Sequence, residues 1–184
     1  MNILEHEPNK PWKTISSEII HENPWFAIKQ DQVLTHTGKQ ITYTYLNHPG
    51  AIAIVPVTPD GRIILIRQYR YTVKDWCWEI PMGGKENLDS LKIAHKELWE
   101  EVGGTSENIR FVTSFYVSNG VSDICCEVFL ALDVKTEKNH PEEAELIRVV
   151  PKPKDEVIRM AREGQITDGL SALAILLCEA LLAG

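Results

Sequence analysis

Cysteine is scarce in this chain, and its spacing does not suggest metal or disulfide chemistry. The 184 residues include four cysteines, at positions 77, 125, 126 and 178, and no two of them form a CxxC pair. This pattern predicts neither a zinc site nor a disulfide framework. Cysteines that are not arranged for cross-linking are typical of a reducing compartment, so we predict a cytoplasmic protein.

Long hydrophobic runs are also missing. The longest apolar stretch, residues 170–183, is interrupted by Ser171 and Glu179 and is too short to span a bilayer. The first residues, MNILEHEPNKPWK, contain no apolar signal core. We therefore expect no membrane partner, and we interpret the C-terminal stretch as a buried helix.

Basic residues are fewer than acidic residues in this chain. The chain has 19 Lys and Arg against 26 Asp and Glu, a formal net charge of −7. This balance argues against nucleic acid or an anionic membrane as the main partner. An apolar fraction of 43% and a charged fraction of 24% are ordinary for a soluble globular protein. The length fits one domain, or one domain with a small N-terminal extension.

The order of the predicted elements indicates the fold class. We predict strands over residues 16–21, 25–35, 40–46, 51–57, 62–67, 76–80, 109–116, 124–132 and 146–150. We predict helices over residues 89–102, 154–163 and 170–182, the last with Thr167 or Asp168 as its N-cap. Strands thus fill the first two thirds, one helix interrupts them and two helices close the chain. This order favours an α+β fold, an α/β/α sandwich around a mixed sheet.

The helix predicted at 89–102 has an apolar side and an acidic side. The apolar side carries Leu91, Ala94, Leu98 and Val102. The acidic side carries Glu97, Glu100 and Glu101, whose mutual repulsion costs roughly a few tenths of a kcal/mol per pair. A divalent cation such as Mg²⁺ would neutralise them, because hard ions bind carboxylate oxygens. The alternative interpretation is a solvated helix face.

Glycines flank this helix on both sides. Residues 81–84, PMGG, precede it, and Gly103 and Gly104 end it. Glycine lets the backbone approach a ligand closely and leaves a carbonyl free to join a coordination shell. This setting favours the metal-site interpretation over the solvated face.

The acidic helix resembles the Nudix box, G-x5-E-x7-R-E-U-x-E-E-x-G-U. Residues 96–103, KELWEEVG, match its second half except that Lys96 stands for the arginine. In the first half Leu88 stands for the glutamate, and the loop after Gly83 is one residue short. In the family that glutamate and arginine brace the loop, so here we expect a loop that is braced by packing.

Further matches resemble the ADP-ribose pyrophosphatase branch of the family. They are residues 66–71 (IRQYRY), 78–83 (WEIPMG), 118–123 (SNGVSD) and 162–169 (REGQITDG). The resemblance implies a Nudix-type α/β/α sandwich that spans 47–184, preceded by a β extension at 1–46 that serves in dimerisation. It also implies hydrolysis of a nucleoside diphosphate linked to another group, with ADP-ribose as the leading substrate and a homodimer as the assembly.

The same resemblance implies a set of site residues. The metal ligands would be Glu97, Glu101, Glu100 and the carbonyl of Met82, with Mg²⁺ as the ion and Mn²⁺ as a substitute. Substrate would be bound by Arg70, Arg67, Glu79 and Trp25. For Arg67 a strand-end surface residue is the favoured alternative, and Glu79 could equally be a surface residue. The base would come from Glu142, Glu143 or Glu145, between which the sequence does not choose.

Two other functions remain open. The chemistry could act on another nucleotide sugar, such as a GDP-hexose. Alternatively, the irregular first half of the box could belong to a Nudix-fold module that binds a nucleotide without hydrolysing it. The intact set of Glu97, Glu100 and Glu101 favours an enzyme, because a binding module has no reason to keep a repulsive cluster.

Overall fold

The computed structural model describes residues 11–85, 88–137 and 146–182. The chain forms two compact units. One comprises Met1–His48 together with Ser118–Ile124, and the other comprises Pro49–Val117 together with Cys125–Gly184.

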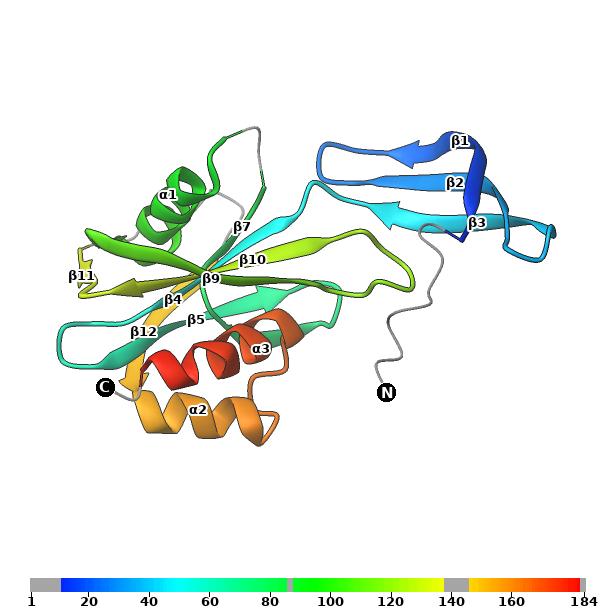
Figure 1. The fold of residues 1–184 in the computed structure, drawn as a ribbon. Coiled ribbons are helices and arrows are strands. Elements are labelled where there is room, and N and C mark those ends of the chain that lie inside the picture. The colour runs from blue at the N-terminus through cyan, green and yellow to red at the C-terminus, as the bar shows by residue number, and fades with distance from the viewer. Residues whose placement is uncertain (1–10, 86–87, 138–145, 183–184) are drawn as a thin grey trace. The chain divides into compact units, whose positions relative to one another are not determined.

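The first unit is an antiparallel sheet with the strand order β1-β2-β3 (Figure 1). Its strands are β1 (Lys13–Glu22), β2 (Ala27–Leu34) and β3 (Gln40–Asn47). The segment 118–124 joins this sheet, because the amide of Leu46 donates to the Val121 carbonyl at 2.9 Å and the Tyr43 hydroxyl donates to the Gly120 carbonyl at 2.7 Å. The predicted strands are confirmed, although β1 is longer than expected.

The second unit contains two main sheets. The mixed sheet has the order β7-β4-β10-β9, in which β4 and β10 are parallel and the other pairs antiparallel. Its strands are β7 (Met82–Gly84), β4 (Ala51–Pro56), β10 (Cys125–Leu132) and β9 (Asn108–Tyr116). The antiparallel sheet β12-β5-β6 is formed by β12 (Ile147–Pro153), β5 (Arg62–Arg70) and β6 (Asp75–Glu79). A short pair joins β8 (Gly104–Thr105) and β11 (Lys135–Thr136).

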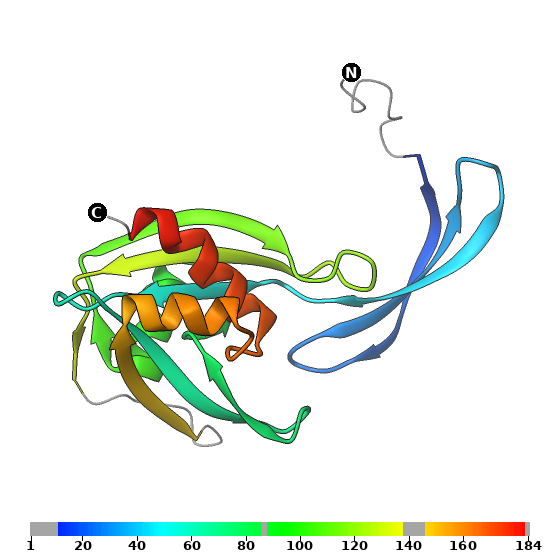
Figure 2. The ribbon, with the colours of Figure 1, turned by 90° about the horizontal axis from the view of Figure 1, so that it is seen from below.

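Helices cover both faces of these sheets. Figure 1 shows α1 (Ser90–Val102) on one side and α2 (Lys154–Arg162) and α3 (Gly169–Cys178) on the other. Figure 2 shows α2 and α3 lying next to each other over the same face. The predicted α+β sandwich around a mixed sheet is confirmed.

The strands β4 and β5 are buried on both faces, which explains their continuous apolar sequences. Ala53, Val55 and Leu65 pack in the cluster that contains α2 and α3. Their neighbours Ile54 and Ile66 pack in the cluster that contains α1. Successive side chains of a strand point to opposite faces. The faces of Leu65 and Ile66 therefore determine the face of each remaining residue of β5.

The helix ends follow their capping residues. Asp89 caps α1 by accepting from the amides of Leu91 and Lys92, and Gly103 ends it with a φ of 65°. The helix predicted over 170–182 is shorter, because α3 ends at Cys178 and a 3₁₀ turn, η2 (Glu179–Leu181), follows. Within the described ranges, no helix is long and apolar enough to cross a membrane.

Strand β5 corrects one prediction. It runs to Arg70, three residues beyond the predicted end, and pairs through Gln68 and Arg70 with Cys77 and Asp75 of β6. The polar residues 68–70 do not show the apolar pattern of a strand. They nevertheless belong to β5, because its hydrogen-bond ladder with β6 continues after the apolar run has ended. This extension places Arg70 beside β6.

Candidate active site

The acidic side of α1 is turned toward the protein rather than away from it. Glu97 and Glu101 are buried, with exposed fractions of 9% and 4%, whereas Leu91 is 39% exposed. The prediction that all three glutamates lie opposite the buried side is therefore wrong for two of them. The buried stripe of α1 includes Ile93, Ala94, Glu97, Leu98, Glu101 and Val102. These positions repeat every three to four residues, so the two carboxylates lie within the packed stripe.

The buried carboxylates contact the glycine segment of β7. Oε2 of Glu101 accepts a hydrogen bond from the Met82 amide at 3.0 Å. A Cβ atom added to Gly83 would lie 2.1 Å from Cδ of Glu97 and 2.3 Å from its Oε1. Only glycine can occupy this position without moving Glu97, so the β7 backbone and α1 are fitted to each other.

Lys96 is a charge neighbour of the acidic helix. Its Nζ lies 3.7 Å from Oε1 of Glu97 and 3.8 Å from Oε2 of Glu100. Both distances are near the limit for an ion pair, so each pair stabilises weakly. In the part of the chain that is described, no three His, Cys, Asp or Glu side chains are clustered closely enough to hold a metal ion. Glu97, Glu101 and Glu100 nevertheless supply the hard oxygen donors that Mg²⁺ prefers.

Arg70 and Glu79 form a bidentate ion pair at the ends of β5 and β6. Nε of Arg70 donates to Oε1 of Glu79 at 2.9 Å, and Nη2 donates to Oε2 at 2.6 Å. Glu79 is only 2% exposed, so the surface alternative for this residue is wrong. The hydrogen bond that Arg70 donates to Glu79 is the main cause that raises the pKa of Arg70, and the charges of Glu79, Glu101 and Asp168 add to it. The guanidinium is thereby fixed within the field of the α1 carboxylates.

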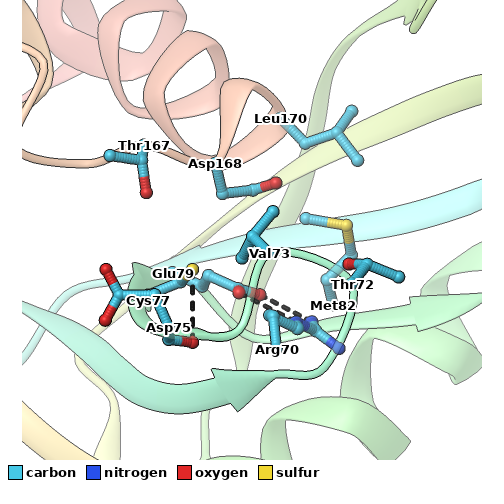
Figure 3. A pocket seen from close by; sticks show the side chains of 10 residues that line it. All are labelled: Arg70, Thr72, Val73, Asp75, Cys77, Glu79, Met82, Thr167, Asp168 and Leu170. Carbon is cyan, nitrogen blue, oxygen red and sulfur yellow. Dashed lines mark hydrogen bonds and ion pairs between the residues drawn. The ribbon is translucent and has the colours of Figure 1, made fainter.

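A cavity of about 580 Å³ opens beside this ion pair. It is lined by Arg70, Thr72, Val73, Asp75, Cys77, Glu79, Met82, Thr167, Asp168 and Leu170 (Figure 3). Figure 3 shows Arg70 and Glu79 on one wall and Thr167 and Asp168, at the start of α3, on the opposite wall. The volume is in the range of small-molecule sites. Asp75 and Cys77 were not predicted, because neither stands in a motif.

Asp168 joins α3 to the strand that carries Glu79. Its Oδ2 accepts from the amide of Ser171 at 2.8 Å and from the Ser171 hydroxyl at 2.6 Å. Oγ of Ser171 in turn accepts from the amide of Ile80 at 3.1 Å. Of the two predicted N-caps, Asp168 is the one observed, and it also lines the cavity.

None of the other predicted residues is among the described residues that line this cavity. Arg67 lies on the opposite face of β5 from Arg70, with its guanidinium carbon 4.9 Å from the centroid of the Trp78 indole. Trp25 belongs to the first unit and is 71% exposed. The candidate bases Glu142, Glu143 and Glu145 lie outside the described residues.

In the described part of the loop before α1, Lys85 makes an ion pair and a backbone hydrogen bond. Lys85 forms an ion pair with Glu127 of β10, and its amide donates to the Gly50 carbonyl at 2.9 Å. The hydrogen bond from Lys85 is the main cause that lowers the pKa of Glu127, and a hydrogen bond with Ser90 also lowers it. Leu88 is 52% exposed, so this residue contributes little to the expected bracing of the loop by packing.

Fold and site together define a class of protein. It is an α/β/α sandwich in which glutamates of α1 pack against the glycine segment of β7. Beside them is a cavity lined by Arg70, which is held by its ion pair with Glu79. A family model described as the NUDIX domain matches residues 46–166, and one described as the nucleoside diphosphate sugar hydrolase N-terminal domain matches residues 12–46.

Comparison with known proteins gives the same class. The ADP-ribose pyrophosphatase of Bacillus subtilis is 32% identical over 166 residues, which cover 89% of this chain and 90% of the relative. The ADP-ribose pyrophosphatase of Mycobacterium tuberculosis is 31% identical over 187 residues, covering 99% and 88%. The solved structure of an ADP compounds hydrolase matches with a TM-score of 0.82 at 18% identity, covering 96% of this chain and 97% of that chain, which supports the fold. The chain therefore belongs to the Nudix hydrolase family, in its ADP-ribose pyrophosphatase-like branch.

Proposed function

We propose that this Nudix hydrolase cleaves the pyrophosphate of a nucleoside diphosphate sugar, with ADP-ribose as the leading substrate and AMP and ribose 5-phosphate as products. The observation that carries the proposal is the meeting of three features in one place. The buried carboxylates of Glu97 and Glu101 lie against β7, Met82 of β7 lines the cavity, and Arg70 is fixed in the same cavity. The two similar bacterial enzymes are both ADP-ribose pyrophosphatases, which supports the choice of substrate.

A divalent cation is part of the proposal. Glu97, Glu101 and Glu100 would hold Mg²⁺, or Mn²⁺ in its place, with the Met82 carbonyl as a further donor. Such an ion neutralises phosphate charge and makes a bound water more acidic. An acidic protein has particular need of one, because its own carboxylates repel a pyrophosphate.

The chain's own side chains would bind and orient the substrate. Arg70 can donate guanidinium N–H groups to a phosphate. Charge-assisted hydrogen bonds between arginine and phosphate are short and directional. Glu79 engages Nε and Nη2, which holds the guanidinium plane in one orientation. In the reaction the oxygen of a water forms a bond to one phosphorus, the bridging P–O bond breaks, and the released phosphate keeps the electron pair. Glu142, Glu143 or Glu145 would accept the water's proton.

We also propose that residues 1–46 act as a dimerisation element and contribute Trp25 to base binding. The supporting observations are the edge position of β1, whose residues are all exposed, and the 71% exposure of Trp25. An edge strand offers unpaired backbone groups to another chain. Large exposed aromatic side chains are frequent at interfaces and are suited to stacking on a base.

The experiment is hydrolysis of a nucleotide-sugar panel with and without Mg²⁺. We expect ADP-ribose to yield AMP faster than GDP-mannose yields GMP, and we expect EDTA to stop both. A preference for GDP-mannose would replace ADP-ribose as the leading substrate and would leave the proposed reaction unchanged. If no panel member is cleaved but ADP-ribose binds, the protein is a binding module, which the departures at Leu88 and Lys96 would then explain.

A single substitution tests the metal assignment. Glu101→Gln keeps the shape and an acceptor for the Met82 amide but removes the charge, so we expect turnover to fall by about a hundredfold or more. Glu107→Gln is the matched control, since Glu107 is exposed and lies outside the cavity. Steady-state rates across a Mg²⁺ titration measure the effect. Wild-type turnover in Glu101→Gln would refute the assignment.

A further inference from the structure

The outer face of the β12-β5-β6 sheet combines cationic and aromatic side chains. Arg148 of β12 lies directly opposite Arg67 of β5, which lies directly opposite Trp78 of β6. Alternation along β5 puts Arg67 and Tyr69 on this face and Gln68 and Arg70 on the other, so the face is separate from the proposed active site. It continues the face on which Leu65 packs with α2 and α3, and we call this continuation the outer face.

Arg67 and Arg148 form an unusual pair for a chain with a net charge of −7. Like charges directly opposite on neighbouring strands destabilise a sheet. Within the described ranges neither guanidinium lies in an ion pair with a carboxylate. An anion held between the two would remove the repulsion and accept hydrogen bonds from both.

Stacking prepares Arg67 for such a contact. Its guanidinium lies over the indole of Trp78, and Nζ of Lys152 lies 5.4 Å from the centroid of the same ring. A guanidinium that stacks by its face keeps the N–H groups on its edge for hydrogen bonds to phosphate oxygens. The same packing limits the rotamers of the side chain, so less conformational entropy is lost on binding.

Exposed aromatic rings continue the outer face beyond the arginines. Tyr69 and Trp76 pack edge to face with ring centroids 6.0 Å apart, yet they remain 44% and 40% exposed. A hollow of about 610 Å³ is lined by Trp76, Leu146, Ile147, Arg148 and Val149. An exposed ring of this kind can stack on a nucleobase, and the volume accommodates a mononucleotide.

We propose that the outer face is a second binding site for a nucleoside monophosphate, distinct from the site of hydrolysis. Arg67 and Arg148 hold the phosphate, and Trp76 with Tyr69 receives the base. A single nucleotide suits the face better than a nucleic acid strand, because two cations match one phosphate while the acidic remainder of the protein repels a polyanion.

The test is calorimetric titration of the whole protein with AMP in EDTA, which withholds the divalent ion from the proposed active site. We expect saturable binding, weakened about tenfold or more by Arg148→Gln and by Arg67→Gln. Trp76→Leu should weaken the binding of AMP and leave the binding of inorganic phosphate unchanged. Arg159→Gln is the control for loss of a positive charge, because Arg159 is exposed on α2 and does not line the hollow.

The outcomes separate this site from the proposed function. Arg148→Gln should hydrolyse ADP-ribose at the wild-type rate, and Glu101→Gln should still bind AMP in EDTA. Unchanged AMP binding in Arg148→Gln overturns the proposal. So does loss of AMP binding in Arg70→Gln alone, because the nucleotide would then occupy the active-site cavity. Absence of hydrolysis by the wild type would not affect these binding measurements.

Discussion

Gly83 shows how one small residue determines the position of a charged one. The space that a Cβ would need at this position is filled by the carboxyl end of Glu97. Its neighbour Gly84 has no other atom within 4 Å of the corresponding position. Two adjacent glycines thus have different structural roles, and only the first is required by a close approach.

This contrast gives a matched pair of substitutions. Gly83→Ala should displace Glu97, lower stability by about 1–3 kcal/mol through overpacking and reduce Mg²⁺-dependent turnover at least tenfold. Gly84→Ala should change stability by less than about 0.5 kcal/mol and leave turnover unchanged. Urea denaturation and a rate assay measure the two effects. Equal behaviour of both variants would show that the contact with Glu97 does not matter.

The loop before α1 shows how an element can reach its position without the usual brace. Where the Nudix pattern has a glutamate and an arginine, this chain has Leu88 and Lys96, and Leu88 is exposed. Lys85 instead connects the loop to β10 through Glu127 and to Gly50 through its amide. The start of α1 is attached to the same point, because Ser90 also hydrogen-bonds Glu127.

The lowered pKa of Glu127 predicts how this attachment responds to pH. Its folded pKa lies below the ordinary value of 4.5, so the interaction stabilises the protein above that value and is lost as pH falls through the folded pKa. Glu127→Gln should therefore be less stable than the wild type at pH 7, with the difference shrinking below about pH 4. Urea denaturation at several pH values measures it, with Glu107→Gln as control. A difference that stays constant with pH would contradict the assignment.

The whole molecule consists of two units of different character. The second contains the sandwich, the cavity and the outer face, and the first is a sheet whose β1 strand is exposed along its length. On β1, Ile15 and Ile19 are 53% and 54% exposed. Apolar side chains on an unpaired edge strand are costly in water unless another chain covers them.

Dimerisation through the first unit can be tested on that strand. We expect the wild type to sediment at twice the mass of one chain, and Ile15→Lys with Ile19→Lys to sediment as a monomer at micromolar concentration. Ser16→Lys adds one positive charge to the same strand at a polar, exposed position on the opposite face from Ile19, and should remain a dimer. Sedimentation velocity gives the masses. If the wild type sediments as a monomer, the proposal that residues 1–46 form a dimerisation element is refuted.

The sequence by itself determined the helices, the longer strands and the family, but not the short strands β7, β8 and β11. Hydrophobic periodicity located the helix that begins after Asp89, and the segments KELWEEVG, IRQYRY and WEIPMG indicated a Nudix hydrolase, because local propensity and motif order depend only on neighbouring residues. Only the tertiary structure decided which side of α1 is buried, because that depends on the strands that pack against it. It paired Arg70 with Glu79 and separated Arg67 from both, since one residue of shift along a strand moves a side chain to the opposite face.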